Sequence, residues 1–442
     1  MNKGSVYHQV EVIDYSFQGM GVVKLANFTI FVPFVKVGDV IDLEITELKK
    51  NYGFGEALNY KRAKVNCEYY YECGSCNLMH LTGSEQQNLK QQTLSNLIDK
   101  NMIHTQLEPF ASSQAKVNYR NKVAMPVYNI DGKLRLGYYR RQSHNLIPIE
   151  SCLLADEQLN ALVKPIEDTL NLLGETAYNY RYKQGNIRHV ILRGSQDNVM
   201  VTIATKSGKI KSQQLLVERL SQIPAIKSII INHQSSPSRK ILGPSNRVNA
   251  GEEQLTMPLN GLDFKVKPNA FFQVNREMTE QIFAYIGEIG DFAGKKILDA
   301  FCGTGTIGLS LAQSAHSVVG IEIDEEAVAS ARFNQAALEI DNAEFICGDI
   351  EQVISKVNDH QFDVAIVDPP RSGLATNMKQ ALVAMKPETV IYISCEPSTL
   401  MRDISELTMH YEVKSIKGFD MFPNTNHIET VAYLKLREEH HG

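Results

Sequence analysis

Cys395 stands at the end of an apolar run, in the stretch YISCEPST (392–399). A free cysteine is most often a small buried hydrophobe, so residue type alone favours a packing role. The stretch VDPPRSG (367–373) also ends an apolar run with a polar side chain, Asp368, although a helix-capping aspartate is a simpler explanation. If the two runs are neighbouring parallel strands, however, the thiol and the carboxylate meet at one sheet edge, where α/β proteins bind ligands.

A glycine-rich turn in ILDAFCGTGTIGLSLA (297–312) joins a predicted strand to a predicted helix. Gly303 and Gly305 let the backbone approach a ligand, and the helix N-terminus offers free N–H groups. A dinucleotide and S-adenosylmethionine both fit such a turn. The glycines of the turn do not by themselves separate the two cofactors, but Asp299 inside the strand suits the ammonium of a methionine moiety. We therefore prefer S-adenosylmethionine.

Two further carboxylates follow later strands and complete the predicted cofactor crevice. Glu322 in GIEID ends the second strand, where a carboxylate can accept hydrogen bonds from both hydroxyls of a ribose. Asp349 in CGDI follows the third strand and is placed to meet an adenine amino group. Carboxylates at successive strand ends make the crevice a more specific prediction than the glycine turn alone.

The elements that must position these groups alternate between strand and helix from residue 294 onward, which predicts a doubly wound parallel sheet. The strands are expected in KKILDAF (295–301), SVVGIEI (317–323), AEFICGD (343–349), FDVAIVD (362–368) and TVIYISC (389–395). The closing segments YEVKSIKGFDMF (411–422) and HIETVAYLKL (427–436) are expected to pair as an antiparallel hairpin on the sheet edge.

Four cysteines form a second candidate site. Cys67, Cys73 and Cys76 lie in CEYYYECGSC (67–76), and Cys152 is distant in sequence. Cys-x2-Cys is a chelating spacing, and four thiolates suit zinc or a [4Fe–4S] cluster, which the spacing alone does not separate. Of the remaining cysteines, we expect Cys302 and Cys347 to be core residues.

The N-terminal 60 residues predict a small five-stranded β-barrel of the OB type, from short β-rich runs broken by glycines. The segment LTGSEQQNLKQQTLSNLIDKNMI (81–103) predicts a helix with a capping box at Thr82 and Glu85. Residues 116–144 carry seven Lys or Arg against one acid, with tyrosines interleaved. A charged solvated face would explain this cluster, but charge with stacking rings also suits RNA.

The bulk properties of the chain are those of a globular protein. Its 442 residues imply two or three domains, and its net charge of −5 restricts any nucleic-acid surface to a local patch. The N-terminus has no apolar segment of a secretory signal, and no run of about 18 apolar residues occurs. We expect a soluble cytoplasmic protein with no membrane association, in which disulfides are disfavoured.

Four motifs in order resemble the RNA uracil-5-methyltransferase family over essentially the whole chain. DPPRSG (368–373), YISCEPST and GFDMFPNTNHIETV (418–431) are similar to the family's DPPRxG, SCNP and FPxTxHxE elements, and AFFQVN (270–275) to its FxQVN stretch. The N-terminal strands resemble a TRAM domain. Glu396 departs from the usual Asn, Gly418 from Lys, and Asn424 from Gln, His or Tyr.

The resemblance implies roles for individual residues. Cys395 would be the nucleophile that attacks uracil carbon 6, and Glu429 the base that removes the carbon 5 proton, although an exposed glutamate on the hairpin is the simpler explanation of its type. Phe271 would support the extruded base. The cofactor and target pocket would be lined by Gln273, Phe301, Thr306, Glu322, Asp349 and Asp368. A [4Fe–4S] cluster would be held by Cys67, Cys73, Cys76 and Cys152.

The resemblance also implies the architecture and the substrate. We expect a Rossmann-like class I methyltransferase domain (81–114 and 268–442), a TRAM-like barrel (1–60) and a mixed α/β central domain that binds the cluster and RNA (61–80 and 115–267). The expected reaction is S-adenosylmethionine-dependent methylation of carbon 5 of a uridine in structured RNA, with 23S ribosomal RNA preferred over transfer RNA. The alternatives are an RNA cytosine-5 enzyme and an inactive RNA-binding or ribosome assembly factor. We expect a monomer without an obligate protein partner.

Overall fold

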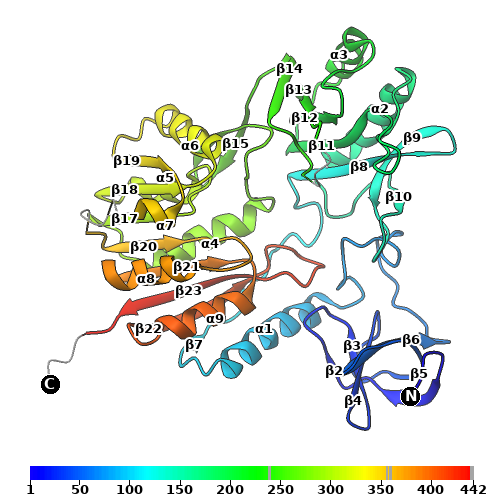
Figure 1. The fold of residues 1–442 in the computed structure, drawn as a ribbon, viewed down its shortest axis with the longest axis horizontal. Helices are drawn as coiled ribbons and strands as arrows, with labels where there is room; N and C mark the ends of the chain where they lie inside the picture. The colour runs from blue at the N-terminus through cyan, green and yellow to red at the C-terminus, as the bar shows by residue number, and fades with distance from the viewer. Residues whose placement is uncertain (237–239, 355–356, 358–360, 439–442) are drawn as a thin grey trace.

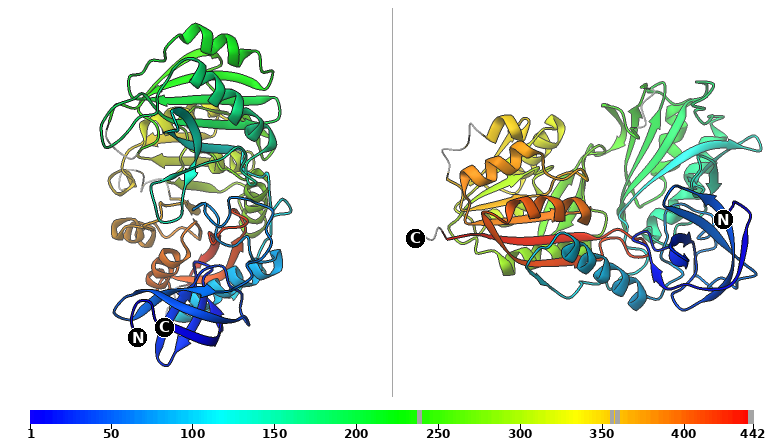
Figure 2. Two further views of the ribbon diagram at one scale, coloured as in Figure 1. Left: turned by 90° about the vertical axis from the view of Figure 1, so that its right-hand side faces the viewer. Right: turned by 60° about the horizontal axis from the view of Figure 1, so that its bottom comes forward.

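The computed structural model describes residues 1–236, 240–354, 357 and 361–438, which form four β-sheets (Figure 1). The N-terminal and central sheets lie on one side of the molecule and the large C-terminal sheet on the other (Figure 2). No helix in these ranges is long and apolar enough to cross a membrane.

The N-terminal sheet has six strands in the order β1-β5-β6-β4-β3-β2, where five were predicted. The additional strand arises because the predicted run 8–15 divides at the buried Val12. The sheet packs on its own apolar core, which includes Val23, Ile30 and Leu43. Its strands are β1 (Val6–Glu11), β2 (Asp14–Tyr15), β3 (Gly21–Leu25), β4 (Phe28–Val32), β5 (Val40–Leu48) and β6 (Tyr52–Leu58).

The central sheet has seven strands in the order β10-β9-β8-β11-β12-β13-β14. Helices α2 (Glu157–Leu172) and α3 (Gln213–Ser221) share one apolar core with this sheet. The strands are β8 (Lys122–Ile130), β9 (Lys133–Tyr139), β10 (Leu146–Pro148), β11 (Ile187–Ser195), β12 (Asn198–Thr205), β13 (Ile226–His233) and β14 (Ser245–Gly251). A separate hairpin, β15 (Leu255–Leu259) with β16 (Leu262–Val266), leads to the C-terminal sheet.

The C-terminal sheet has the order β19-β18-β17-β20-β21-β23-β22-β7 and confirms the predicted doubly wound fold. Its first five members pair in parallel, β23 runs antiparallel to β21, and β22 and β23 form the predicted hairpin. The strands are β17 (Lys296–Ala300), β18 (Ser317–Glu322), β19 (Ala343–Cys347), β20 (Val364–Val367), β21 (Thr389–Ser394), β22 (Tyr411–Phe419) and β23 (Glu429–Leu436).

Helices cover both faces of the C-terminal sheet, because two separate cores form on it. One core includes side chains of α4 (Arg276–Ile289), α5 (Thr306–Ala312) and α6 (Glu325–Ala337). The other includes side chains of α8 (Thr376–Met385) and α9 (Pro397–Leu407), next to the short α7 (Ile350–Val353). This layered arrangement leaves the carboxyl ends of the parallel strands free to carry a site.

Helix α1 (Gly83–Lys100) belongs to the same core, although it lies far from that sheet in sequence. Thr82 and Glu85 form the predicted capping box. After α1, strand β7 (Gln106–Leu107) pairs with β22, so β7 and not the hairpin forms the sheet edge. A Cβ at position 418 would lie 2.6 Å from side-chain atoms of Leu94 and Phe110 and would clash with them. Close packing therefore explains the glycine at this position.

Candidate active site

The direction of the strands brings Asp368, Cys395 and Glu429 to one rim of the C-terminal sheet. Asp368 follows β20 and Cys395 follows β21, and these two strands are parallel neighbours. Glu429 is the first residue of β23, which runs antiparallel to β21, with Ser394 opposite Thr430. An antiparallel strand begins where its parallel neighbours end, so the thiol and the two carboxylates share one rim.

The Cys395 thiol is half-buried and lies within the electrostatic reach of both carboxylates. Burial, reinforced by the charge of Glu429, raises the pKa of Cys395, while a hydrogen bond to the Arg371 side chain opposes this rise. The thiolate form therefore has one cationic partner. The positive charge of Arg371 is the largest influence that lowers the pKa of this thiol.

Glu429 is buried, with 5% of its surface exposed. Burial, together with the charge of Asp368, raises the pKa of Glu429 well above its usual value, and Arg371 acts in the opposite direction. Burial also raises the pKa of Asp368 to about 7. Two interacting buried carboxyls resist ionising together, so the pair retains a proton to higher pH than an isolated exposed carboxyl would.

Arg371 was not among the predicted site residues, although it lies inside the quoted DPPRSG motif. An exposed arginine beside two prolines gives no indication of a site by its type. The sequence feature that could have identified Arg371 is its position, three residues after the carboxylate of Asp368 at a strand end. Because the turn returns its side chain to the rim, the guanidinium meets both Cys395 and Glu429.

Glu396, which departs from the usual Asn, occupies the N-cap position of α9, with Pro397 as the first helical residue. Its carboxylate accepts a hydrogen bond from the Ser398 hydroxyl at 2.7 Å. A negative charge at this helix end is favourable, because it meets the positive end of the helix dipole. This position at the helix N-terminus explains why a glutamate is tolerated at residue 396, which the sequence motif alone does not explain.

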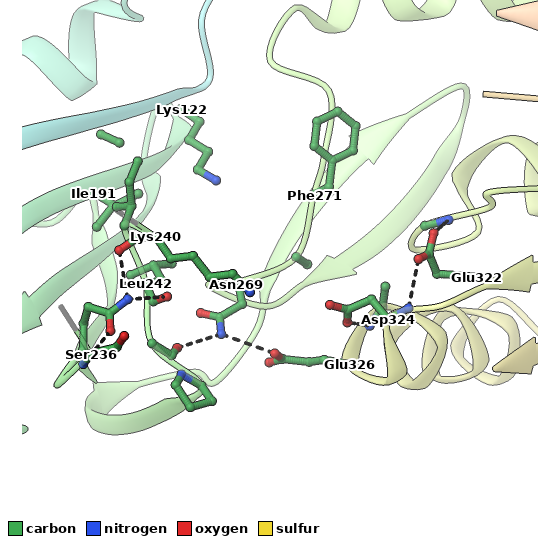
Figure 3. Close-up of a pocket in the computed structure, with 18 residues that line it drawn as sticks. Lys122, Ile191, Ser236, Lys240, Leu242, Asn269, Phe271, Glu322, Asp324 and Glu326 are labelled. Carbon is green, nitrogen blue, oxygen red and sulfur yellow. Dashed lines mark hydrogen bonds between the residues drawn. The ribbon is translucent and has the colours of Figure 1, made fainter. Parts of the chain in front are cut away.

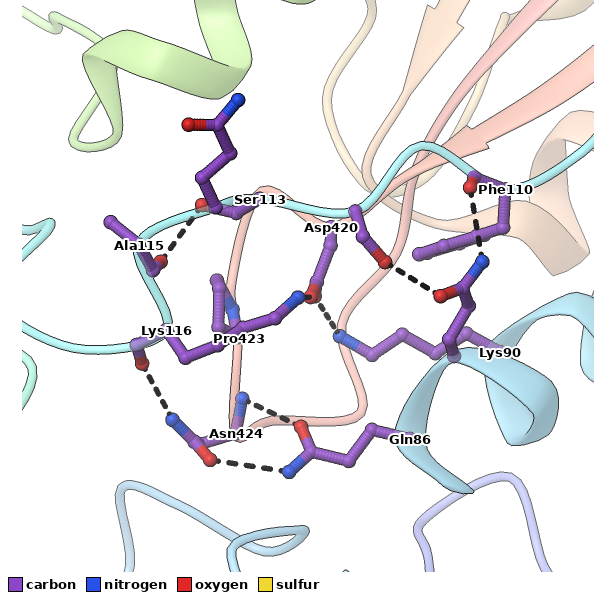
Figure 4. Close-up of polar contacts among 12 residues, drawn as sticks. Gln86, Lys90, Phe110, Ser113, Ala115, Lys116, Asp420, Pro423 and Asn424 are labelled. Carbon is purple, nitrogen blue, oxygen red and sulfur yellow. Dashed lines mark hydrogen bonds and ion pairs between the residues drawn. The ribbon is translucent and has the colours of Figure 1, made fainter. Parts of the chain in front are cut away.

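The loop between β22 and β23 is held by buried polar contacts, shown in Figure 4. Asp420 binds the Lys90 amine at 2.6 Å and the Lys116 amine at 3.0 Å. Asn424 exchanges hydrogen bonds with Gln86, and its side chain also donates to the Lys116 carbonyl. Asn424 has a φ of +67°, a conformation that Asn tolerates better than bulkier residues. These contacts fix the loop that leads to Glu429.

The predicted cofactor turn follows β17, and its backbone departs from ordinary geometry. Phe301, Gly303 and Gly305 all have positive φ, of +64°, +54° and +78°. A bulky residue in this region is strained, and such strain concentrates at functional sites. Glu322 accepts hydrogen bonds from the backbone N–H of Gly303 and of Asp324. Its carboxylate thereby holds the glycine turn against the end of β18.

A cavity of about 870 Å³ opens beside this turn and reaches the central sheet (Figure 3). Gly303, Glu322 and Phe271 line it, with Lys122 on the opposite wall. The phenyl ring of Phe271 is 66% exposed, which suits a role in supporting a base.

The remaining predicted cofactor residues are not among those that line this cavity. Thr306 is the first residue of α5, and Asp349 follows β19. Gln273 lies before α4, and its carbonyl accepts a hydrogen bond from Asn121. Phe301, Thr306, Asp349 and Asp368 follow the carboxyl ends of strands, whereas of the predicted cofactor residues only Glu322 lines the cavity.

Asp299 is buried in β17 directly behind the turn. Its Oδ2 accepts the backbone N–H of Gly308 at 2.9 Å, while its Oδ1 has no partner within the described ranges. Burial, with smaller effects of Asp368 and Glu322, raises the pKa of Asp299 to about 7, and the Gly308 hydrogen bond opposes the rise. An unpaired buried carboxylate oxygen is costly, and a cation bound beside the turn would relieve that cost.

The four cysteines predicted as ligands line one small pocket, which Tyr138, Ile149 and Leu154 also enclose. The peptide N–H and carbonyl of Cys152 are both held by the Asn160 side chain. No group of three or more His, Cys, Asp or Glu in the described ranges has the arrangement to hold a metal ion. The structure therefore shows a pocket that the four thiols share, but not a metal site. The prediction that Cys302 and Cys347 are core residues was right for Cys302, which is buried, and wrong for Cys347, which is exposed at the end of β19.

Two sequence profiles match this chain. The profile of the tRNA (uracil-5-)-methyltransferase family matches residues 83–437, and that of the TRAM domain matches residues 3–58. An uncharacterized RNA methyltransferase of Clostridium tetani (strain Massachusetts / E88) is 33% identical over 447 residues, covering 98% of this chain and 97% of its own length. Another, from Enterococcus faecalis (strain ATCC 700802 / V583), is 34% identical and covers 96% of both chains.

Among solved structures, the chain is similar to Pyrococcus abyssi tRNA (uracil-54, C5)-methyltransferase in complex with S-adenosyl-L-homocysteine. The TM-score is 0.79 at 26% sequence identity, and the match covers 96% of this chain and 100% of that one. The similarity therefore extends through all of the sheets and is not restricted to the C-terminal fold.

Proposed function

Because the chain belongs to the tRNA (uracil-5-)-methyltransferase family, we propose that it methylates carbon 5 of a specific uridine in structured RNA through a covalent cysteine adduct. The first candidate substrate is 23S ribosomal RNA, the preference drawn from the sequence resemblance. The chain is an S-adenosylmethionine-dependent RNA methyltransferase of this family, and its TRAM domain suits an RNA substrate. The single observation that carries the mechanism is the meeting of Cys395, Glu429 and Arg371 at the rim beside the cofactor turn.

Cys395 has the position of a nucleophile. Carbon 5 of uracil is too weak a nucleophile to attack a sulfonium methyl group. Addition of the Cys395 thiolate to carbon 6 makes the ring an enolate, and carbon 5 then becomes nucleophilic. The positive charge of Arg371 favours the thiolate before the addition.

Glu429 has the position of the base that completes the reaction. After methyl transfer, carbon 5 carries both the methyl group and its original proton. Removal of that proton by the Glu429 carboxylate restores the double bond as the bond between sulfur and carbon 6 breaks, which frees Cys395. A carboxylate with a raised pKa is a stronger base than an exposed one, as this step requires.

The residues around the glycine turn fit S-adenosylmethionine, which supplies the methyl group when bound. Glu322 at the end of β18 would receive the ribose hydroxyls, and Asp299 has a free buried oxygen for the ammonium. Phe271 would support the extruded target base, because a uridine in structured RNA must leave its stack to be methylated. Gln273, Phe301, Thr306, Asp349 and Asp368 would complete the rim.

We also propose that Cys67, Cys73, Cys76 and Cys152 hold a [4Fe–4S] cluster. The four thiols line one shared pocket, which suits zinc or a cluster, and the resemblance to the family favours the cluster. Arg120 and Arg141 act electrostatically on these thiols, and the Nε of each is buried and unpaired within the described ranges. Two cations offset part of the charge of four thiolates.

The cluster proposal has a direct test. Protein purified anaerobically should be brown and absorb visible light, and iron and sulfide analysis should give four of each, the stoichiometry of this cluster type. A colourless protein that contains one zinc ion would contradict the proposal.

The domain boundaries predicted from the sequence also remain a proposal, namely 1–60, 61–80 with 115–267, and 81–114 with 268–442. The TRAM profile, which ends at residue 58, and the packing of α1 on the C-terminal sheet support them.

Transfer RNA is the second candidate substrate, favoured by the similarity to the Pyrococcus abyssi enzyme. The test is to incubate the protein with S-adenosylmethionine and with either 23S ribosomal RNA or transfer RNA from cells that lack this gene, and to map 5-methyluridine by mass spectrometry. Product in the ribosomal RNA alone is expected. Product in transfer RNA alone would make transfer RNA the substrate. Product in neither RNA would favour an inactive RNA-binding factor.

A further inference from the structure

The central sheet has one face that its helices do not cover. Along β8, Val123, Met125 and Val127 face the core beneath α2 and α3. The alternate residues Lys122, Ala124, Pro126 and Tyr128 line cavities on the opposite face. In β11, Val190 and Leu192 face the core, whereas His189 and Ile191 face the cavities.

A hollow of about 980 Å³ occupies this uncovered face, and we call it the tyrosine hollow. It is lined by Tyr128, Tyr138, Tyr139, Tyr180, His144 and His189. The rings support one another, because Tyr139 makes edge-to-face contacts with Tyr128 and His144 at centroid distances of 6.2 and 6.0 Å. Small residues, including Gly74 and Ala124, leave space between the rings.

The tyrosine hollow adjoins the crevice that holds the cofactor turn. Ala124 and Ile241 line both the hollow and the cavity beside Gly303 and Glu322. At its other end, Gly74, Ser75 and Gln142 are shared with a third cavity, whose wall includes His427 in the loop before Glu429. An RNA strand that reaches the active site therefore passes close to the hollow.

The hollow contains a buried polar group without a partner. His189 is 7% exposed, and its Nδ1 forms no hydrogen bond within the described ranges. Burial and the neighbouring Arg188 lower the pKa of His189 to about 4, so the imidazole is neutral at physiological pH. A neutral imidazole offers one donor and one acceptor, which suits the edge of a base better than a phosphate.

From these observations, and resting on the proposed function, we propose that the tyrosine hollow binds an unpaired base of the RNA strand next to the target uridine. Tyr139 and Tyr128 provide the stacking surface, and the neutral His189 lies in the wall of the hollow. Cationic side chains lie at both ends, Lys240 near the cofactor cavity and Arg140, which pairs with Glu72, at the other. Aromatic rings between cations are typical of sites for single-stranded nucleic acid. The enzyme therefore requires an unpaired flank beside its target.

The first test measures RNA affinity and needs no catalysis. A short single-stranded RNA oligomer and the same oligomer annealed to its complement are titrated against the full chain, with wild type, Tyr139→Ala and Tyr139→Phe. Wild type should prefer the single strand. Tyr139→Ala should lose roughly five- to a hundredfold in affinity, as expected for one lost stacking contact. Tyr139→Phe keeps the ring and should bind like wild type.

Two controls separate stacking from folding. Tyr182 is 63% exposed and lines none of the three cavities, so Tyr182→Ala should leave affinity unchanged. Affinity for S-adenosyl-L-homocysteine should be the same in all variants. Unchanged RNA affinity in Tyr139→Ala, or equal binding of single and double strands by wild type, would overturn the inference.

A crosslinking experiment locates the base. RNA carrying 4-thiouridine beside the target should crosslink to residues 128–144 or to the strand that holds His189. Crosslinks confined to the N-terminal sheet would overturn the inference. An RNA that crosslinks in the tyrosine hollow but is never methylated would leave this inference standing and contradict the proposed function.

Discussion

Replacing Asp299 by asparagine should stabilise the ligand-free protein and weaken its cofactor binding. Asp299 is 1% exposed, with one oxygen unpaired, and burial raises its pKa to about 7 from the ordinary 3.8. The difference of about three pKa units, at about 1.4 kcal/mol for each, corresponds to about 4 kcal/mol by which folding opposes ionisation. This is an upper limit, because asparagine also leaves a buried polar atom unpaired.

The sign of the effect depends on pH. Below about pH 4, the carboxyl is protonated in both folded and unfolded chains, so the substitution changes little. Between about pH 4 and pH 7, the unfolded chain ionises while the folded chain does not, and wild type loses up to about 1.4 kcal/mol per pH unit. Above pH 7 the penalty is complete. The stability advantage of Asp299→Asn should therefore grow with pH and then level off.

Urea unfolding followed by circular dichroism at several pH values measures this advantage. The transition to follow is the one that S-adenosyl-L-homocysteine shifts in wild type, because it reports the domain that binds the ligand. Asp341→Asn, at an exposed position, is the matched control and should show no trend with pH. Calorimetry should show weaker binding of S-adenosyl-L-homocysteine to Asp299→Asn. A variant that is no more stable than wild type at pH 8 would refute the argument.

Three further predictions concern the other parts of the site. Glu429→Gln should accumulate a covalent adduct on unmodified RNA, seen as a band of reduced mobility in a gel, and rapid turnover by this variant would exclude Glu429 as the base. In wild type, the rate of adduct resolution should rise with pH as Glu429 loses its proton. Lys90→Met should lower the free energy of unfolding by about 3 kcal/mol, because it breaks a buried ion pair with Asp420. The side chain of Lys116 is 37% exposed, so Lys116→Met should lower it by under about 1 kcal/mol. Equal effects of the two substitutions in urea unfolding would contradict the difference in burial. Cys76→Ser should remove the visible absorption of the anaerobic protein while Cys302→Ser retains it, and absorption that survives in Cys76→Ser would exclude that ligand.

The sequence predicts those parts of the site that depend on local pattern. Strand ends are recognisable from apolar runs, and the rule that parallel strands share a carboxyl edge places Asp368 beside Cys395. The capping box at Thr82 and Glu85 is equally local and was correctly predicted. The number of N-terminal strands was wrong, because the division of one β-rich run at Val12 depends on how that residue packs.

Other features depend on contacts between distant segments, which no local pattern contains. Lys90 and Asp420 are 330 residues apart and meet only because α1 packs against the C-terminal sheet. Arg371 acquires its place from the turn after β20, and the exposure of Cys347 depends on what covers the end of β19. The tyrosines of the basic segment suggested stacking surfaces, but only the strand alternation of the folded sheet shows which of them share a hollow.

The central claim is that Cys395 attacks the uracil ring, and trapping with 5-fluorouridine RNA tests it most directly. Fluorine at carbon 5 cannot be removed as a proton, so the adduct persists after methyl transfer. Wild type, and Cys347→Ala as a matched control at an exposed cysteine, should form an adduct that survives denaturation, whose RNA-linked peptide contains Cys395. Cys395→Ala should form none. An adduct that persists in Cys395→Ala would contradict the account.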